Sequence, residues 1–218
     1  MNIINASAEI ITPFVGEEVM KHIEICGRVC YKSESRITED SCNTFIRGII
    51  KRGHESVLEH FSFTARFICD RGVSHEIVRH RLASYSQEST RYCNYSAVTE
   101  DFNGEITVIK PLWIDEENYR SGFANWRNAC EKAEREYFRL ITDCDWTPQQ
   151  ARSVLPNSLK TEVVMTANLR EWRHFFKLRC APAAHPQMRE VATQLFKQAY
   201  AKLPVIFEDI AKEMNVEC

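Results

Sequence analysis

Cations and hydroxyl groups are concentrated in one stretch of the sequence, RHRLASYSQESTRY, which spans residues 79–92. The basic side chains and hydroxyls in it are Arg79, His80, Arg81 and Arg91 with Ser84, Ser86, Ser89, Thr90 and Tyr92. The whole chain has a formal net charge of only −2. Because clustered guanidinium groups repel one another, the cluster is most easily explained by an anion that binds to it. Each charge-assisted hydrogen bond to a phosphate is worth roughly 1.5–3 kcal/mol, so two or three suffice for micromolar binding of a phosphorylated metabolite.

Further basic residues lie on two later predicted helices. Arg152 and Arg179 lie where these helices turn into other structure, and Arg170 and His174 share one face of the second helix, at i and i+4. The last three belong to one predicted helix, NLREWRHFFKLR, whose N-terminus at Asn168 is a natural anion site. Taken singly, each arginine is more simply explained as a side chain whose stem packs on apolar surface. Together with residues 79–92, however, these residues indicate two phosphorylated ligands.

The segment GHESVLEH, residues 53–60, holds two histidines and two glutamates just before a predicted strand. Such a cluster could bind a metal ion, but its spacing is not HExxH, so we expect no metal site. The simplest alternative is a turn with solvated acids. A third interpretation places His54, Ser56 and Glu59 at the edge of a bound ligand.

Length and composition indicate one globular domain over residues 1–218, because 218 residues with 44% hydrophobic content can bury one sizeable core. The pI near 6.4 disfavours a general nucleic-acid binder. The sequence shows no membrane-spanning run and no secretory leader, and its nine cysteines lack a CxxC pair, so we expect a cytoplasmic protein with reduced thiols. The scarce glycines form neither GxGxxG nor a P-loop. A nucleotide would therefore be held by side chains and helix ends.

Hydrophobic periodicity predicts the elements that must position these residues. Strands are predicted over 61–67 and 161–168, with shorter strands within 2–15 and 105–111. Helices are predicted over 16–31, from 41 to about 51, over 73–81, from 115 onward, from 147 to 156, after Asn168, and through 188–199, the last kinked or divided at Pro204. This pattern predicts an α+β fold, in which a modest, mostly antiparallel sheet is packed by several helices in a single domain.

The opening stretch also fits a longer pattern, RHRxxSxxxxSxR. Its fixed positions are Arg79, His80, Arg81, Ser84, Ser89 and Arg91. In this respect the chain resembles the flavin-dependent thymidylate synthases. GHESVLEH is similar to the GHxSxxEH-like segment of that family, and ARSVLP and NLREWRHFFKLR are similar to its two later blocks. The resemblance covers nearly the whole chain.

The resemblance implies an α+β homotetramer with active sites between subunits. It implies a methyltransferase that converts dUMP to dTMP, with methylenetetrahydrofolate as carbon donor and NADPH-reduced FAD as hydride source. It also implies a flavin set, by which we mean the FAD contacts His54, Ser56, Glu59, Arg79, His80, Arg81, Asn168, Arg170 and His174. The implied substrate set, which contacts dUMP, is Glu76, Arg79, Gln87, Glu88, Ser89, Thr90, Arg91, Arg152 and Arg179. Arg179 is the implied catalytic residue, because it would face the pyrimidine and favour its N3-deprotonated form.

Two other functions are compatible with parts of the sequence. The first is a module that binds RNA or a regulatory nucleotide through the basic residues from Arg79 to Arg91. The overall acidity disfavours RNA, and a bound, reducible flavin would exclude a simple binding role. The second is a transferase with a nucleophilic cysteine, since Cys180 and His185 lie near Arg179. We expect Cys180 instead to be a small buried thiol at a helix end.

Overall fold

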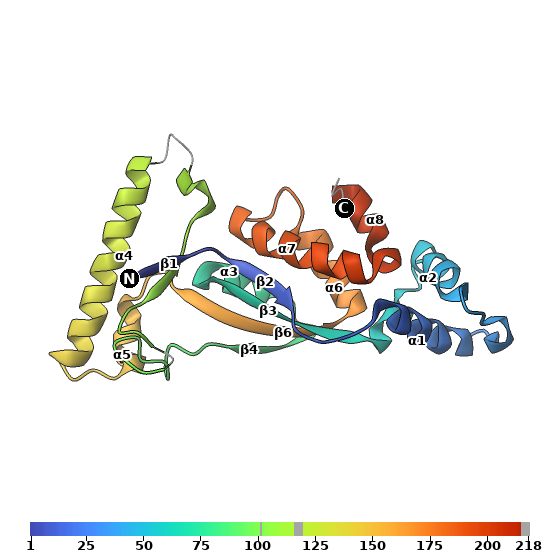
Figure 1. Ribbon diagram of the computed structural model, residues 1–218, viewed down its shortest axis with the longest axis horizontal. Helices are drawn as coiled ribbons and strands as arrows, with labels where there is room; N and C mark the ends of the chain where they lie inside the picture. The colour runs from blue at the N-terminus through green and yellow to red at the C-terminus, as the bar shows by residue number, and fades with distance from the viewer. Residues whose placement is uncertain (101, 116–119, 215–218) are drawn as a thin grey trace. The chain divides into compact units, whose positions relative to one another are not determined.

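The computed structural model describes residues 1–100, 102–115 and 120–214 (Figure 1). Its strands are β1 (Asn2–Ile4), β2 (Ser7–Ile10), β3 (Ser62–Asp70), β4 (Ala83–Gln87), β5 (Thr107–Ile109) and β6 (Lys160–Asn168). Its α-helices are α1 (Gly16–Val29), α2 (Ser41–Lys51), α3 (Arg71–Ile77), α4 (Arg120–Thr142), α5 (Pro148–Ala151), α6 (Leu169–Arg179), α7 (Pro186–Lys202) and α8 (Pro204–Met214). Short 3-10 helices are η1 (Glu34–Arg36), η2 (Glu55–His60), η3 (Leu112–Asp115) and η5 (Arg152–Val154).

The predicted α+β class is confirmed. Four strands form an antiparallel sheet in the order β2-β3-β6-β4, and helices pack around it. A separate two-stranded sheet pairs β1 with β5 in parallel, with Ile3 opposite Val108. Among the helices that the structure describes, none is both long and apolar enough to cross a membrane.

The chain divides into two compact units. Unit 1 consists of Met1–Ser7, Phe67–Arg79 and Ser86–Val163, and unit 2 consists of Ala8–Arg66, His80–Tyr85 and Val164–Cys218. The stretch that begins at Arg79 therefore passes from unit 1 into unit 2 and returns to unit 1. A single functional domain over the whole chain stays a prediction.

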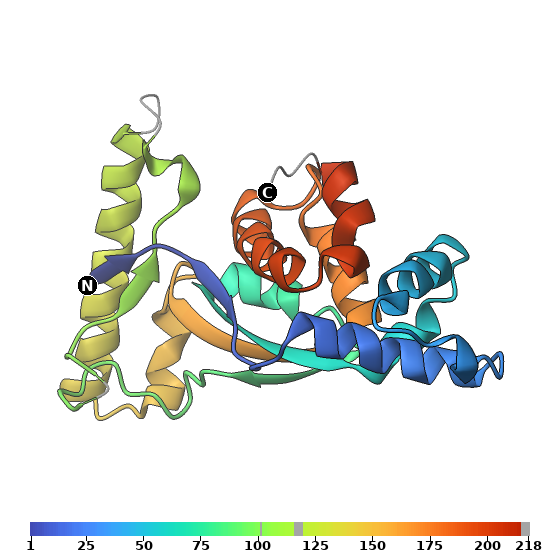
Figure 2. The same cartoon turned by 45° about the vertical axis from the view of Figure 1, so that its right-hand side comes forward.

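Unit 1 is built on the long helix α4, which lies beside β1 and β5 (Figure 2). Its buried core is Tyr95, Ile106, Val108, Cys130, Tyr137, Ala151 and Leu159. Cys130 and Tyr137 belong to the apolar stripe that predicts this helix, and Trp126 of the same stripe packs against the core. The helix was predicted from Asp115. The structure instead ends η3 at Asp115 and describes α4 from Arg120, so the predicted start partly falls on 116–119, outside the described residues.

The core of unit 2 is centred on the aromatic face of α6, which lies beside α7 and α8 (Figure 1). Trp172 stacks on Phe63 with ring centroids 4.6 Å apart. Phe176 meets Phe196 of α7 and Phe207 of α8 edge to face, at 5.3 and 5.5 Å. Proline 204 divides the last two helices, as the sequence predicts. The aromatic packing fixes α6, which carries several residues of the flavin set.

Two sequence predictions need correction. The helix predicted over 73–81 is α3, which ends at Ile77 and is followed by β4, a strand that the sequence did not predict. Strand β4 was missed because its residues, ASYSQ, alternate between half-buried and exposed positions but include no large aliphatic side chain. The helix predicted from 147 to 156 is only α5, followed by a 3-10 turn. Its predicted capping box is present, with the Thr147 N–H donating to Gln150 Oε1 at 2.9 Å.

An ion pair between a buried arginine and a partly exposed aspartate joins α6 to α8 in unit 2. Arg173 is only 1% exposed and donates to both carboxylate oxygens of Asp209, at 2.8 and 2.6 Å, and to Glu55 at 3.1 Å. Burial by itself would raise the pKa of Asp209, but the hydrogen bond and charge of Arg173 lower it. This contribution to stability is therefore present above the ordinary carboxyl pKa and is lost as the pH falls through the lowered value.

We expect Asp209→Ala to lower the free energy of unfolding by about 2 kcal/mol, because the buried Arg173 would lose its two bonds to Asp209 but keep its bond to Glu55. The neighbouring variant Glu208→Ala is the matched control. Its partner Arg47 is about half exposed at 52%, so the control should lose at most about 1 kcal/mol. Urea unfolding measures both values. Equal losses in the two variants would contradict the argument.

Candidate active site

A cavity of about 740 Å³ in unit 2 lies where η2 meets α6. Its lining includes Glu59, Asn168, Arg170 and His174, which are four members of the flavin set. These residues come from two predicted motif segments more than a hundred positions apart. The structure thus brings together residues that the sequence could only group by resemblance.

Local rules explain how these side chains are placed. Asn168 ends β6 and caps α6, with its Oδ1 accepting from the Glu171 N–H at 2.9 Å. The cap sets the direction of the first turn of α6. Arg170 lies in this turn and donates to Glu59 at 2.6 Å. Both side chains of that pair are about half exposed, so the pair orients Arg170 more than it stabilises the fold.

The cavity suits a flavin cofactor. Its lining carries three cations, Arg170, Arg173 and Lys177, beside three carboxylates, Glu55, Glu59 and Glu171, and the Asn168 amide retains its N–H donors. Leu82, which is 75% exposed, offers apolar surface to a ring. Apolar surface for a planar ring and polar groups that fix its orientation are thus both present, as in most cofactor sites.

The other predicted flavin residues lie outside the lining of this cavity. His54, Ser56 and Arg81 are exposed in unit 2, and Arg79 is exposed in unit 1. The Tyr31 hydroxyl lies 2.9 Å from His54 Nδ1. His80 differs from all of these, because it is buried at 4% exposure.

The buried His80 links Glu171 to Arg179. Arg179 Nε donates to His80 Nε2 at 3.1 Å, and His80 Nδ1 lies 2.9 Å from Glu171 Oε1. A guanidinium can only donate, so Nε2 must be the acceptor and Nδ1 must carry the proton. His80 is therefore the neutral tautomer that donates to Glu171 and accepts from Arg179.

The surroundings of His80 favour this neutral form. Burial is the largest cause that lowers the pKa of His80, and the charge of Arg179 adds to it, whereas the hydrogen bond to Glu171 acts in the opposite direction. The Tyr85 hydroxyl also donates to the His80 carbonyl at 2.6 Å. The ring is thus held from two sides, and it fixes the orientation of the Arg179 guanidinium.

A metal ion does not suit the same residues. Ligand atoms of His80, Glu171 and His174 lie within 4.8 Å of one another. Both ring nitrogens of His80 are already engaged, however, one with a cationic guanidinium. The His80 ring therefore binds the Arg179 guanidinium, and it has no free lone pair for a metal ion.

Unit 1 contains eight of the nine residues of the substrate set, all except Arg179. Two arginines of this set, Arg91 and Arg152, each bond to a side chain from another part of unit 1. Arg91 Nε donates to Gln149 Oε1 at 2.8 Å, and Arg152 Nη1 donates to Thr90 Oγ1 at 3.3 Å. Within the described ranges neither arginine pairs with a carboxylate, so both keep donors for an anionic ligand.

The remaining substrate residues in unit 1 are held by one another or by their neighbours. Gln87 donates to Ser74 at 3.0 Å, and the Ser89 hydroxyl accepts from the Arg91 N–H at 3.3 Å. The Glu88 carboxylate accepts from Tyr95 at 2.7 Å and from Lys160 at 2.9 Å. Glu76 is half-buried in the last turn of α3, and Arg79 follows it, exposed.

Lys160 was not singled out in the sequence. Burial opposes its charge, but hydrogen bonds to Glu162 and Glu88 raise the pKa of Lys160, so it stays an ammonium. It compensates the charge of Glu88 inside an otherwise basic cluster. No sequence motif includes Lys160. Only its place on β6, two residues before Glu162, could have indicated that it pairs with an acid.

Comparisons with known proteins agree with the motif. A family model described as "Thymidylate synthase complementing protein" matches residues 16–205. A flavin-dependent thymidylate synthase of Geobacter sulfurreducens is 34% identical over 194 residues, which cover 86% of this chain and 80% of the relative. The chain belongs to the flavin-dependent thymidylate synthases. A member of this family from Pyrococcus furiosus is 34% identical over 177 residues, with 81% and 70% of the two chains covered.

A solved structure shows the same fold. It is the crystal structure of the UMP/dUMP methylase PolB from Streptomyces cacaoi, bound with 5-Br dUMP. The sequence identity is 24%, the TM-score is 0.79, and 97% of each chain is covered. At this identity the likeness concerns the fold alone, and it agrees with the α+β architecture described above.

The sequence predicts no partner for Glu171, which lies in the first turn of α6. Its side chain bonds to His80, which lies 91 positions earlier. Tyr85, placed by the unpredicted strand β4, was missed as well. The available signal was an acid in the first turn of a helix that also carries the predicted catalytic arginine. Acids in the first turn of a helix are too common for this signal to identify His80 as the partner of Glu171.

We expect Cys180→Ala to retain dTMP formation within about tenfold, the residual loss coming from packing beside Arg179. Cys180 is 6% exposed, and burial raises the pKa of its thiol to about 12, so hardly any thiolate is present at neutral pH. Product formation by the variant measures the effect, with mass spectrometry of the wild type quenched during turnover. Lost activity together with a uracil adduct on Cys180 would overturn this expectation.

Proposed function

We propose that this chain methylates dUMP at C5 to give dTMP, with the carbon from methylenetetrahydrofolate and the reducing equivalents from NADPH through FAD. One observation carries the proposal: the flavin-motif residues of two distant segments line a single cavity in unit 2. Membership of the flavin-dependent thymidylate synthases supports the same reaction. The residue roles that follow are part of the proposal.

Arg91 and Arg152 hold the phosphate of dUMP. Both have guanidinium donors that no carboxylate in the described residues occupies, and Thr90 and Ser89 add hydroxyls beside them. Charge-assisted, bidentate hydrogen bonds are the strongest way to hold a phosphate with side chains. This cluster therefore positions the nucleotide and leaves the base free to react.

Arg179 promotes reaction at C5. A cation beside the pyrimidine favours loss of the N3 proton, and the resulting anion is more electron-rich at C5. The neutral His80 holds the guanidinium by its Nε and so sets its orientation. FAD, when bound, supplies the hydride that completes the methyl group. The contribution of the chain is thus mainly positioning and electrostatics.

The same proposal includes the assembly and the location of the protein. The residues for flavin and for dUMP belong largely to different units, and the family resemblance assigns the complete site to an interface between subunits. We infer a homotetramer of four 25.4 kDa chains, roughly 100 kDa in total. The proposed ligands are charged small metabolites, which supports a cytoplasmic location.

We expect the purified protein to be yellow, with absorption bands close to those of free flavin. Adding NADPH without oxygen should bleach these bands, because the cofactor accepts the hydride. An absorption spectrum before and after NADPH makes the test. A colourless protein that takes up no added FAD would refute the proposal, and would favour a nucleotide-binding module instead.

A further inference from the structure

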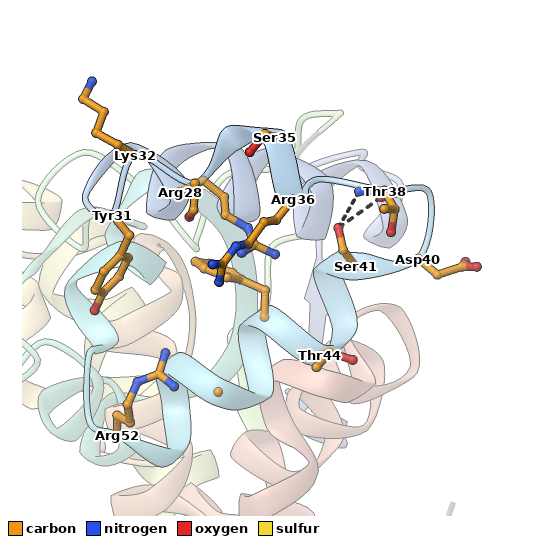
Figure 3. A pocket seen from close by; sticks show the side chains of 13 residues that line it. Arg28, Tyr31, Lys32, Ser35, Arg36, Thr38, Asp40, Ser41, Thr44 and Arg52 are labelled. Atoms are coloured by element: carbon orange, nitrogen blue, oxygen red, sulfur yellow. Dashed lines mark hydrogen bonds between the residues drawn. The ribbon is translucent and has the colours of Figure 1, made fainter.

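A second cavity in unit 2, of about 810 Å³, lies between the end of α1, the loop that follows it, and α2. We call it the α1–α2 pocket. Its lining includes Arg28, Tyr31, Arg36, Thr38, Ser41 and Arg52. Figure 3 shows the guanidinium groups of Arg28, Arg36 and Arg52 directed into the same hollow. None of these residues belongs to the flavin or substrate set.

The charge in this pocket is not balanced. Arg28 is neutralised by Glu24, to which it donates from Nε and Nη2 at 3.0 and 2.6 Å. Arg36 and Arg52, by contrast, make no ion pair within the part of the chain that the structure describes. Asp40 is the one acid among the described lining residues, and Figure 3 shows it pointing away from the hollow. The pocket therefore holds two uncompensated guanidinium groups.

One wall of the pocket is held by buried contacts around Arg28, whereas Arg36 and Arg52 are exposed. The Arg28 guanidinium lies over the Phe45 ring, 4.7 Å from its centroid, while the Glu24 it binds is only 1% exposed. The Ser41 hydroxyl donates to the same Glu24 at 2.7 Å. One wall is thus fixed by buried contacts, and the hollow beside it is lined with hydroxyls and free guanidinium groups.

A contact connects the pocket with the flavin set. The hydroxyl of Tyr31, a lining residue, lies 2.9 Å from Nδ1 of His54. His54 is the residue that the family resemblance implies beside the flavin and the folate. A co-substrate with its ring at His54 could therefore extend past Tyr31 into the pocket.

We propose that the α1–α2 pocket binds the oxyanion tail of a co-substrate, and this inference rests on the proposed function. Two co-substrates carry such a tail at a distance from their reacting ring: the folate, with glutamyl carboxylates, and NADPH, with the 2′-phosphate that NADH lacks. Carboxylates and phosphates both match the fork of donors that an arginine presents. In both cases a terminal oxyanion group of the co-substrate binds to Arg36 and Arg52.

The test compares the wild type with the double variant Arg36→Gln, Arg52→Gln. The matched control is Arg127→Gln, Arg139→Gln on α4, which removes the same charge from exposed ion pairs outside any site described above. Calorimetric titration with inorganic pyrophosphate measures the pocket in the FAD-loaded protein, saturated with dUMP so that Arg91 and Arg152 are already occupied. We expect binding at least tenfold weaker in the double variant and unchanged in the control.

Kinetics then identify the source of the tail. If folate supplies it, the KM for pentaglutamyl methylenetetrahydrofolate rises at least tenfold in the double variant, while the KM for the monoglutamyl form changes less than twofold. If NADPH supplies it, the KM for NADPH rises and that for NADH does not. Equal pyrophosphate affinity in the wild type and the double variant, or no change in any of these KM values, overturns the proposal. Flavin content and dUMP affinity, measured on the same samples, report separately on the proposed function.

Discussion

Arg179→Ala is expected to lower kcat for dTMP formation by about 10²–10³-fold, the range typical for removing one preorganised charged or hydrogen-bonding group from a reacting centre. The reason is geometric as well as electrostatic. Arg179 is held through Nε by His80, which Glu171 holds in turn at 2.9 Å. Its cation is thus fixed before substrate binds. Single-turnover rates at saturating dUMP measure the effect without interference from binding.

Arg179→Lys is the informative control. A lysine keeps the charge but replaces the planar fork, with its Nε donor, by a flexible ammonium. We expect its rate to lie between those of the wild type and the alanine variant. Rates within fivefold of wild type for the alanine variant would remove Arg179 from the reacting centre and leave it a structural role at the end of α6.

Arg91→Ala should weaken dUMP binding by about 2–3 kcal/mol, roughly 30- to 150-fold, because the phosphate would lose its charge-assisted bonds to that guanidinium. The exposed Arg91 side chain is oriented mainly by its bond to Gln149 at 2.8 Å, so its removal should spare the fold. Equilibrium titration with dUMP measures the affinity, and flavin content should stay near wild type.

Gln149→Ala separates charge from orientation. It removes the group that orients Arg91 but leaves the guanidinium, so we expect a loss of less than about tenfold, the size of one modest hydrogen bond. If Arg91→Ala bound dUMP as tightly as wild type, Arg91 would not belong to the substrate site. Arg152 and Thr90 would then remain as the anion-binding group.

The parts of the fold that the sequence predicts well are those that local rules decide. The alternation in FSFTARF gives β3, the four-and-three spacing of apolar residues gives α4, and Asn168 caps α6 as predicted. Pro204 separates α7 from α8 for an equally local reason. In each case the signal lies within a few residues of the element that it specifies.

The details of the candidate site depend on contacts that local rules do not reach. His80 is read from the RHR motif as a flavin contact, but its ring lies buried between Glu171 and Arg179, 91 and 99 positions away. Glu88 likewise meets Lys160 across 72 positions. Strand β4, on which Tyr85 is placed, is short and has few apolar residues, so its pairing with β6 is what defines it. The motif thus identifies the participating residues, whereas tertiary packing determines their partners.

One measurement tests the central claim most directly. FAD-loaded protein is reduced without oxygen and mixed with dUMP and methylenetetrahydrofolate, while flavin absorbance is followed and dTMP is quantified by chromatography. The account predicts about one dTMP for each flavin, with the oxidised absorbance returning at the rate of product formation. It would be contradicted by dTMP that forms while the flavin stays reduced, or by the absence of dTMP from protein that binds both FAD and dUMP.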